Sequence, residues 1–278
     1  MRRVRVVTDS TADIDRTTAE SLGIEVVPIY VRWGTTSFQD GVDLSPSDFY
    51  RRLAKRRDHP ATAQPSPEDF ARVYASHAES GGIVSIHISA KISGTYNSAR
   101  LGAKTVKGGA LVEVVDSGLN SAGLAMVVLA GARTAAEGGS VDEVAVEARR
   151  ACAETRMVGL FDTMKYLARG GRISPAIALA AGVMRVKPVL TFRDGEIVRA
   201  GLVRSREGGM RRLLQLIAEM GSLRSVIVSH STQQDELDRF LRSMKNVYPG
   251  EVEKVFEMGA ALGVHGGPGM VIVAGRRV

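Results

Sequence analysis

Cysteine is almost absent from this chain of 278 residues, since Cys152 is the only one. No disulfide can form within the chain, which excludes a disulfide scaffold and is typical of a protein from a reducing compartment. Long apolar runs are missing as well. The longest, residues 122–132, is far shorter than the ~20 residues that a membrane-spanning helix needs. The first residues contain no apolar signal-peptide segment, so we expect a cytoplasmic protein.

Aromatic residues are scarce, at 5% of the chain with one tryptophan, Trp33. Basic residues exceed acidic ones, 37 against 30, which gives a net charge of +7. This charge attracts anions such as nucleic acids, membrane surfaces and acidic ligands. Platforms that bind single strands need aromatic side chains, so we expect no nucleic-acid partner. The densest basic segment, residues 51–57, is typical of a helix end, where cations complement the helix dipole.

Several signatures of enzymes are also missing. The chain has no G-x-S-x-G nucleophile elbow, no phosphate loop, no G-x-G-x-x-G fingerprint and no S-x-x-K motif. The five histidines share no spacing that would ligate a metal. These absences argue against nucleotide or metal chemistry of the chain's own. We therefore expect no catalytic residues, no metal and no cofactor.

The first half of the chain alternates short apolar strands with helical segments. Strands are predicted at residues 4–7, 24–31, 83–89 and 111–115, and helices at 16–22, 70–77, from about 97 and up to 136. Ser45 and Ser66 each precede a proline in the N-cap pattern that starts a helix, and a loop is predicted between those helices at 60–65. The alternation predicts a parallel sheet covered on both faces, whose ligands bind beyond the carboxyl ends of the strands.

The second half follows a different pattern. Asp194-Gly195 between two apolar runs, within residues 189–198, is the strongest short signal for a β-hairpin. Further strands are predicted at 226–229 and 271–274, and helices at 210–220 and 235–244. We therefore predict an α/β protein of two domains. Residues 1–155 form the parallel-sheet domain, and residues 156–278 form a smaller α+β domain with a mixed or antiparallel sheet.

Hydroxyl side chains mark the start of the helix predicted after the strand at 83–89. Ser93 and Thr95 flank Gly94, which allows a close approach of the backbone. The free N–H groups of a helix N-terminus bind anions well. The same residues could instead only cap the helix, and spacing alone leaves both interpretations open.

A second glycine-rich segment precedes the last strand. His265 is followed by Gly266 and Gly267, and then by Pro268-Gly269. The glycines and the proline fix an unusual backbone, and the histidine is placed where it could donate to an anion. A glycine-rich turn with an incidental histidine is the alternative.

Three arginines and one further histidine complete the candidates. Arg172 lies between glycines and a Ser-Pro helix start, and Arg204 and Arg206 flank a serine. An arginine can bind a phosphate or a partner's carboxylate, or simply lie on the surface. His87 lies inside a predicted buried strand and is interpreted as structural. The apolar run at 177–184 is interpreted as core.

Five segments together resemble one protein family. They are residues 8–13, 62–66, 93–99, 170–174 and His265 with 267–269. On these segments the chain is identified as a member of the DegV family of bacterial lipid-binding proteins, whose fatty-acid carriers are called FakB. The segments keep the family's order over nearly the whole chain. Ala63 departs from the pattern because the family often has serine there, which removes a possible donor and leaves Thr62 in place.

The resemblance implies a function. One long-chain fatty acid is expected between the two domains, with its carboxylate bound by Thr62, Ser93 and His265. A separate ATP-dependent fatty acid kinase is the implied partner and converts the bound acid to acyl phosphate. We expect the loops with Gly94, Thr95, Gly266 and Gly267 to support the site. We expect Arg172, Arg204 and Arg206 to dock the kinase. A monomer with transient contact to a membrane surface is expected.

Two alternatives come from other classes. Ser93 with His265 could make the chain a stand-alone acyl hydrolase or acyltransferase, which predicts a burst and an acyl-enzyme with an activated ester. A DNA-binding regulator would rest on the net charge alone. It predicts retention on DNA that falls steeply with salt.

Overall fold

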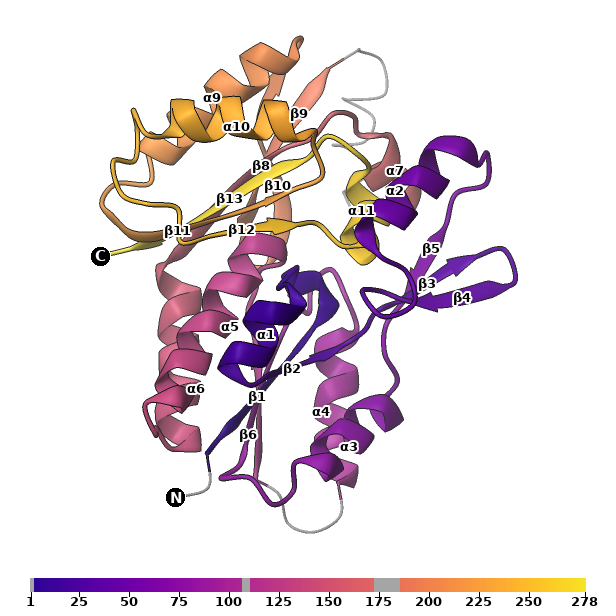
Figure 1. Cartoon of the computed structure of the whole chain (residues 1–278), viewed down its shortest axis with the longest axis vertical. Coiled ribbons are helices and arrows are strands. Elements are labelled where there is room, and N and C mark those ends of the chain that lie inside the picture. Colours follow the sequence, from indigo (N-terminus) through magenta and orange to yellow (C-terminus); the bar gives the residue numbers. More distant parts are fainter. Residues whose placement is uncertain (1–2, 107–110, 173–185) are drawn as a thin grey trace.

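The computed structural model describes residues 3–106, 111–172 and 186–278. Figure 1 shows two main sheets, one above the other, with a small third sheet at the side. The lower sheet is parallel throughout, in the order β2-β1-β6-β7. Its strands are β1 (Arg5–Asp9), β2 (Ile24–Val27), β6 (Ile83–His87) and β7 (Val112–Asp116).

Helices cover this sheet, as its apolar strands require. They are α1 (Arg16–Leu22), α3 (Pro67–Ser76), α4 (Thr95–Thr105), α5 (Ser121–Ala136) and α6 (Val141–Glu154), and a short 3-10 helix η1 (Ser10–Ala12) follows β1. Local chemistry sets their ends. Ser66 and Ser140 form capping boxes at α3 and α6, and α1 ends at Gly23 in the left-handed conformation. The predicted helix after Ser93 begins two residues earlier than expected.

The upper sheet is mixed, in the order β10-β9-β8-β13-β11-β12. Only β11 and β12 are parallel to each other among its described strand pairs. Its strands are β8 (Thr155–Leu160), β9 (Lys187–Arg193), β10 (Glu196–Val203), β11 (Leu223–His230), β12 (Lys254–Glu257) and β13 (Val271–Arg277). The helices of this part are α7 (Lys165–Gly170), α9 (Arg206–Ala218), α10 (Gln234–Met244) and α11 (Ala260–Gly266). The predicted fold class is confirmed.

The hairpin of β9 and β10 has the turn that its sequence predicts. Asp194 and Gly195 both have positive φ, 51° and 80°. Positive φ at both central residues is the type I′ turn, whose twist matches that of the flanking strands. The hairpin prediction is therefore confirmed. The predicted core run at 177–184 lies outside the described residues.

One strand prediction and one loop prediction are wrong, because parts of both segments pair in the small third sheet. Residues 24–31 are not one strand, because β2 ends at Val27 and Pro28 offers no N–H to continue the ladder. The chain then leaves the parallel sheet and forms β3 (Tyr30–Trp33) of the small sheet, with β4 (Thr36–Gln39) and β5 (Ala61–Ala63). The expected loop at 60–65 thus contains β5, since its two prolines lie just outside the paired residues.

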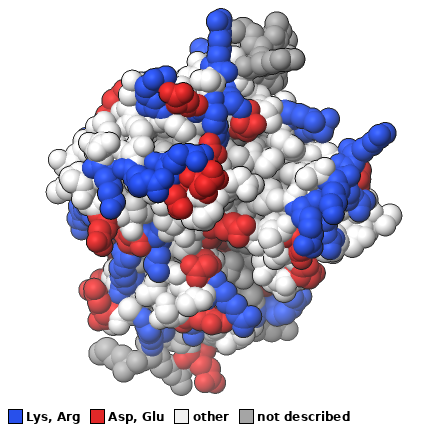
Figure 2. Space-filling model, turned by 45° about the horizontal axis from the view of Figure 1, so that its top comes forward, with Lys and Arg blue, Asp and Glu red and all other residues white. Residues whose placement is uncertain are grey.

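The basic segment at 51–57 is the end of α2 (Pro46–Lys55), as predicted. Figure 2 shows blue side chains gathered over this part of the molecule. Several of these side chains form ion pairs or stack on aromatic rings close to them in space. Arg56 forms an ion pair with Asp58 at 2.8 Å and lies over the Trp33 ring, and Arg52 lies over Phe38. These contacts support the structural interpretation of the cluster.

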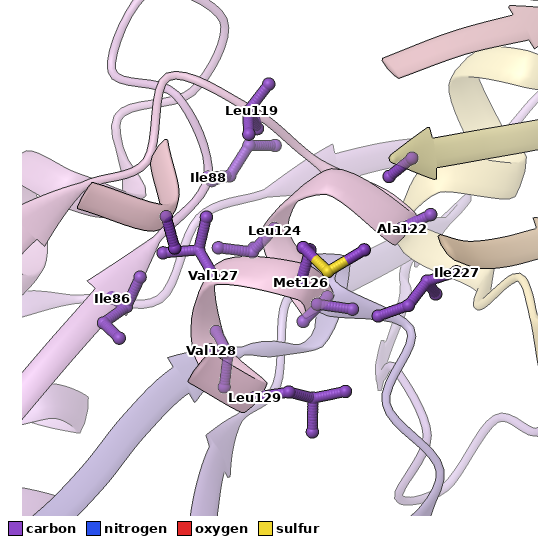
Figure 3. Close-up of a cluster of buried hydrophobic side chains, with 14 of the residues drawn as sticks. Ile86, Ile88, Leu119, Ala122, Leu124, Met126, Val127, Val128, Leu129 and Ile227 are labelled. Atoms are coloured by element: carbon purple, nitrogen blue, oxygen red, sulfur yellow. The ribbon is translucent and has the colours of Figure 1, made fainter. Parts of the chain in front are cut away.

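The core is built around α5. Thirteen of its 16 residues are buried, because it packs on β1 and β6 of the lower sheet and on β8, β11 and β13 of the upper one. Figure 3 shows Leu124 and Val127 of this helix with Ile86 of β6, Ile88 just after β6, and Ile227 of β11. The upper sheet begins at Thr155, but one apolar cluster holds residues of both sheets. The division of the chain at residue 155 stays a prediction.

Candidate functional site

A cavity lies between the carboxyl edge of the lower sheet and one face of the upper sheet. Loops after the lower strands contribute Thr11, Ile88 and Ser93, and β8 and β13 contribute Gly159 and Ile272. The space not filled by protein atoms, including the part open to solvent, is about 890 Å³.

The polar end of the cavity is organised by a hydrogen bond between Thr62 and His265. Thr62 Oγ1 and His265 Nε2 are 2.8 Å apart. Thr62 lies in β5, and His265 lies near the end of α11. Two residues more than 200 positions apart in the sequence are thus brought together. The other ring nitrogen, Nδ1, has no hydrogen-bond partner within the described part of the chain.

His265 is a neutral histidine. Burial, with smaller contributions from the Arg172 guanidinium and the nearby His59, lowers its pKa to about 4. A neutral imidazole has one N–H to donate and one nitrogen that accepts. At neutral pH, His265 can therefore hold one polar group at each nitrogen without adding a charge to the cavity.

Ser93 also lines the cavity, next to the start of α4. Its hydroxyl lies 2.8 Å from Thr95 Oγ1 and accepts a hydrogen bond from the Thr95 amide at 3.3 Å. Gly94 is the N-cap of α4, and no side chain caps the helix. Ser93 contacts the first turn and lines the cavity, and its role as a carboxylate ligand stays a prediction. No hydrogen bond joins Ser93 to His265 among residues 3–106, 111–172 and 186–278, so the paired nucleophile and base of a hydrolase are not in place.

Gln64 is a site residue that the sequence interpretation passed over. It lines the cavity, and its amide donates to Ser98 Oγ at 3.0 Å. Gly94 leaves room for it, since a Cβ there would lie 2.0 Å from Gln64 Oε1. The Gln64 amide in segment 62–66 is the feature of the sequence that could have indicated this role, next to the Thr62 hydroxyl.

The glycines after His265 allow a close approach of neighbouring side chains. A Cβ on Gly266 would lie 1.9 Å from Met270 Sδ, and one on Gly267 would lie 2.2 Å from the Tyr166 ring. Gly267 also has a positive φ of 75°, which favours glycine. These contacts fix where α11 ends, and hence where its histidine lies.

The three predicted docking arginines lie in different settings. Arg172 lines the cavity, and its guanidinium donates to the Gly170 carbonyl at 2.6 Å. Arg204 is exposed and away from the cavity, whereas Arg206 is bound to Glu236 at 2.7 Å. The expected carboxylate donors Thr62, Ser93 and His265 carry no permanent positive charge, and this set stays a prediction. Arg172 adds a permanent positive charge to the lining of the same cavity.

Two buried carboxyl groups hold the helix that carries His265. Asp13 accepts from the Gly259 amide at 2.9 Å and from Ser121 Oγ at 2.6 Å, and Asp40 accepts from the Ala260 amide at 2.7 Å. Burial raises the pKa of Asp13 to about 8 and that of Asp40 to about 6. Both groups therefore join the start of α11 to the first half of the chain.

Stability should depend on pH through Asp13. Its pKa is higher in the folded chain than in the unfolded one, so its contribution is complete below about pH 4 and is lost as the pH rises towards 8. Asp13→Asn resembles the protonated form. We expect wild type to lose on the order of 4 kcal/mol more than Asp13→Asn between pH 5 and pH 8.5. Urea unfolding at both pH values measures this, and equal losses would contradict it.

His87 is structural, as predicted. Its Nδ1 lies 2.9 Å from Asp9 Oδ2 and its Nε2 lies 2.7 Å from Ser85 Oγ, which also accepts from Tyr74. The Asp-His-Ser order resembles a catalytic triad, but all three side chains are fully buried. Asp9 also accepts from the Thr11 amide. The network thus shapes the loop that brings Thr11 to the cavity.

Two negative findings apply to residues 3–106, 111–172 and 186–278. They contain no helix that is long and apolar enough to cross a bilayer. They also contain no group of three or more His, Cys, Asp or Glu side chains that could hold a metal ion.

Comparison with known proteins decides the family. The model of the uncharacterised DegV family matches residues 3–275. The chain belongs to the DegV family. A DegV domain-containing protein of Streptomyces coelicolor is 37% identical over 282 residues, with 99% of each chain covered.

Solved structures of this family have the same fold. A DegV protein from Thermus thermophilus, described by its fatty acid binding, is 32% identical with a TM-score of 0.88, and the match covers 99% of this chain and 100% of that one. A stearic acid-binding protein from Eubacterium ventriosum is 26% identical with a TM-score of 0.89, over 100% and 99% of the two chains. The family membership inferred from the five sequence segments is therefore confirmed.

Proposed function

We propose that this DegV-family chain binds one long-chain fatty acid in the cavity, with its carboxylate at Thr62, Ser93 and His265. The observation that carries the proposal is the division of the cavity lining. It is polar around the Thr62–His265 hydrogen bond and mostly apolar elsewhere. The fatty acid binding described for the relatives from Thermus thermophilus and Eubacterium ventriosum supports it.

The register of the upper sheet orders the apolar lining by distance from His265. Met270 packs on Gly266, beside His265, and directly precedes β13. Within β13, Ile272 pairs with Gly159, and two residues further on the partner strand reaches Met157. Each step of two residues advances ~7 Å along a strand. An acyl chain that starts at His265 would therefore run over Gly159 towards Met157.

The acyl chain and the carboxylate of a bound fatty acid contribute to the binding free energy in different ways. Burying about 15 carbons at ~0.8 kcal/mol each gives a gross gain of about 12 kcal/mol, from which association entropy removes several kcal/mol or more. A carboxylate that was buried without partners would be very costly. Thr62, Ser93 and neutral His265 offer hydrogen bonds, and Arg172 offers the opposite charge.

We further propose that a separate ATP-dependent fatty acid kinase acts on the bound acid. A carboxylate oxygen would attack the γ-phosphorus of ATP, giving acyl phosphate and ADP. The lack of a phosphate loop in this sequence supports a partner that supplies the nucleotide site. Arg172 is exposed as well as lining the cavity, so it could bind the kinase or the transferred phosphate. We keep the monomeric state, the cytoplasmic location and the transient membrane contact as parts of this proposal.

Native mass spectrometry of the purified protein tests the binding step. We expect an added mass equal to one long-chain fatty acid, which denaturing extraction then identifies. Protein that arrives without lipid should take up one equivalent of added palmitic or stearic acid. A protein that is bare and takes up neither acid would overturn the proposal, and an acyl-enzyme formed with an activated ester would favour the hydrolase alternative.

The kinase step has its own test. Loaded protein, a fatty acid kinase and ATP should give acyl phosphate, and Arg204→Glu should lower its rate at unchanged lipid content. Arg204 is the clearest of the three positions, because Arg172 also lines the cavity and Arg206 is held by Glu236. Arg206→Glu would additionally break that ion pair. Unchanged turnover in all three charge reversals would contradict docking at these arginines.

A further inference from the structure

The tip of the β9–β10 hairpin contacts the first half of the chain. Ser89 Oγ donates to the Gly195 carbonyl at 2.7 Å. A Cβ on Gly118 would lie 3.9 Å from Gly195 Cα, so the two turns are close. Ser89 follows β6 and Gly118 follows β7. The hairpin of the upper sheet thus crosses to the carboxyl edge of the lower one.

The residues just before and after this tip form one row across the upper sheet. Phe192 pairs with Ile197 within the hairpin. Val158 pairs with Thr191, so Met157 is the neighbour of Phe192 on β8. Phe192 and Ile197 are half-buried and pack on the main apolar cluster, to which Met157 belongs.

This row lies at the end of the cavity that is remote from His265. Met157, Gly159 and Phe161 line the cavity along β8. Phe161 directly follows the strand, and Met157 is the one of the three that lies farthest back along it. Phe161 is four positions along the chain from Met157, which is ~13 Å of extended strand. The row of Met157, Phe192 and Ile197 is thus where the far end of a long ligand would arrive.

A solvent-exposed groove lies on the other side of the same residues. Met157, Thr191 and Phe192 line both the cavity and this groove, which is also bordered by Lys91 and Arg193. Residues that border two spaces lie between them. The cavity and the groove are therefore adjacent at Met157, Thr191 and Phe192, and we expect a shorter side chain there to join them.

We propose that Phe192, together with Met157 and Ile197, is the end wall that sets the longest acyl chain the cavity accepts, with the Ser89–Gly195 contact holding it closed. This inference rests on the proposed fatty acid binding and adds a residue-level account of chain length. The Phe192 ring is the largest of the three side chains. Its removal would join the cavity to the groove, and the methyl end of a longer chain could then extend there.

The test measures which acid is bound from a mixture. Delipidated wild type and Phe192→Ala are loaded with equal amounts of palmitic, stearic, arachidic and behenic acid, and native mass spectrometry quantifies each complex. Each additional buried methylene strengthens binding roughly fourfold, so a chain two carbons longer should gain roughly fifteenfold in the variant. Ile197→Ala should shift the preference in the same direction, and Phe192→Trp should shift it towards shorter acids.

Val198→Ala is the matched control. Val198 follows Ile197 on the same strand and loses a similar side chain, but it does not line the cavity. Its bound acids should match those of wild type. If Phe192→Ala does not fold, Phe192→Leu and Ser89→Ala replace it, and we expect both to shift binding towards longer acids.

The outcomes separate the two proposals. Suppose that wild type binds acids and that the Phe192, Ile197 and Ser89 variants bind the same distribution of chain lengths. This result would overturn the end-wall proposal and leave the proposed fatty acid binding intact. Wild type that binds none of the acids would overturn the proposed function itself.

Discussion

Replacing His265 with alanine should weaken fatty acid binding about a hundredfold. The substitution removes a donor to the carboxylate and also the partner of Thr62, which lies 2.8 Å away. Hydrogen bonds to charged groups are worth ~1.5–3 kcal/mol each, which is a factor of ~10–150 in affinity. Thr62 would lose its orientation in the same variant, so we expect an effect in the upper part of this range. Titration of delipidated protein with a fluorescent fatty acid measures it.

Two controls make this result specific. His77→Ala removes a partly buried histidine that is paired with Glu25 and does not line the cavity, and its affinity should equal that of wild type. Thr62→Val keeps the shape of Thr62 but removes the hydroxyl, and we expect about a tenfold loss. If His265→Ala binds as tightly as wild type while folding normally, the carboxylate is held elsewhere.

Filling the middle of the cavity floor should have a still larger effect. Gly159 is the next-to-last residue of β8, where a Cβ would lie 3.1 Å from Ile272 and 3.2 Å from Phe161. A glycine inside a strand marks a place where something approaches the backbone closely. The branches of valine at this position would project into the path of the acyl chain. About half of a long chain would then lose its burial at ~0.8 kcal/mol per methylene, so Gly159→Val should bind palmitic acid at least several hundredfold more weakly.

Gly201→Val separates this effect from a general cost of valine. Gly201 lies in β10 of the same sheet, and a Cβ there would make ordinary contacts of 3.5 and 3.6 Å with Arg212 and Val189. It does not line the cavity. Thermal unfolding should show that both variants are folded. Palmitic acid binding by Gly159→Val at the level of Gly201→Val would place the acyl chain away from β8.

The sequence predicts local structure well wherever the deciding chemistry is local. Ser45 and Ser66 determine two predicted helix starts, and Asp194-Gly195 determines a turn. Pro28 marks the division of residues 24–31 in the sequence, because it has no N–H for the ladder. The destination of the second half could not be predicted in the same way, since Val31 pairs with Phe38 and Thr62 in another sheet.

The candidate site illustrates the same limit. The family resemblance predicts Thr62 and His265 as carboxylate ligands. Their hydrogen bond depends on the contact between β5 and α11, which the sequence does not show. Asp40 had no pattern around it that would predict its role, since it acts through the amide of Ala260, 220 residues further on. Arg172 was expected to bind a partner, and its position at the cavity became apparent only from the packing of α7 against α11.

The position of α5 has a consequence for how binding and folding are coupled. A helix that is buried against two sheets gives neither sheet a complete core without the other. The chain should therefore unfold in one cooperative transition, although its sequence pattern changes near residue 155. A ligand that binds only the folded form stabilises it by mass action. Here that stabilisation would extend to the whole molecule, so the melting temperature of the intact chain would report how much of it carries lipid.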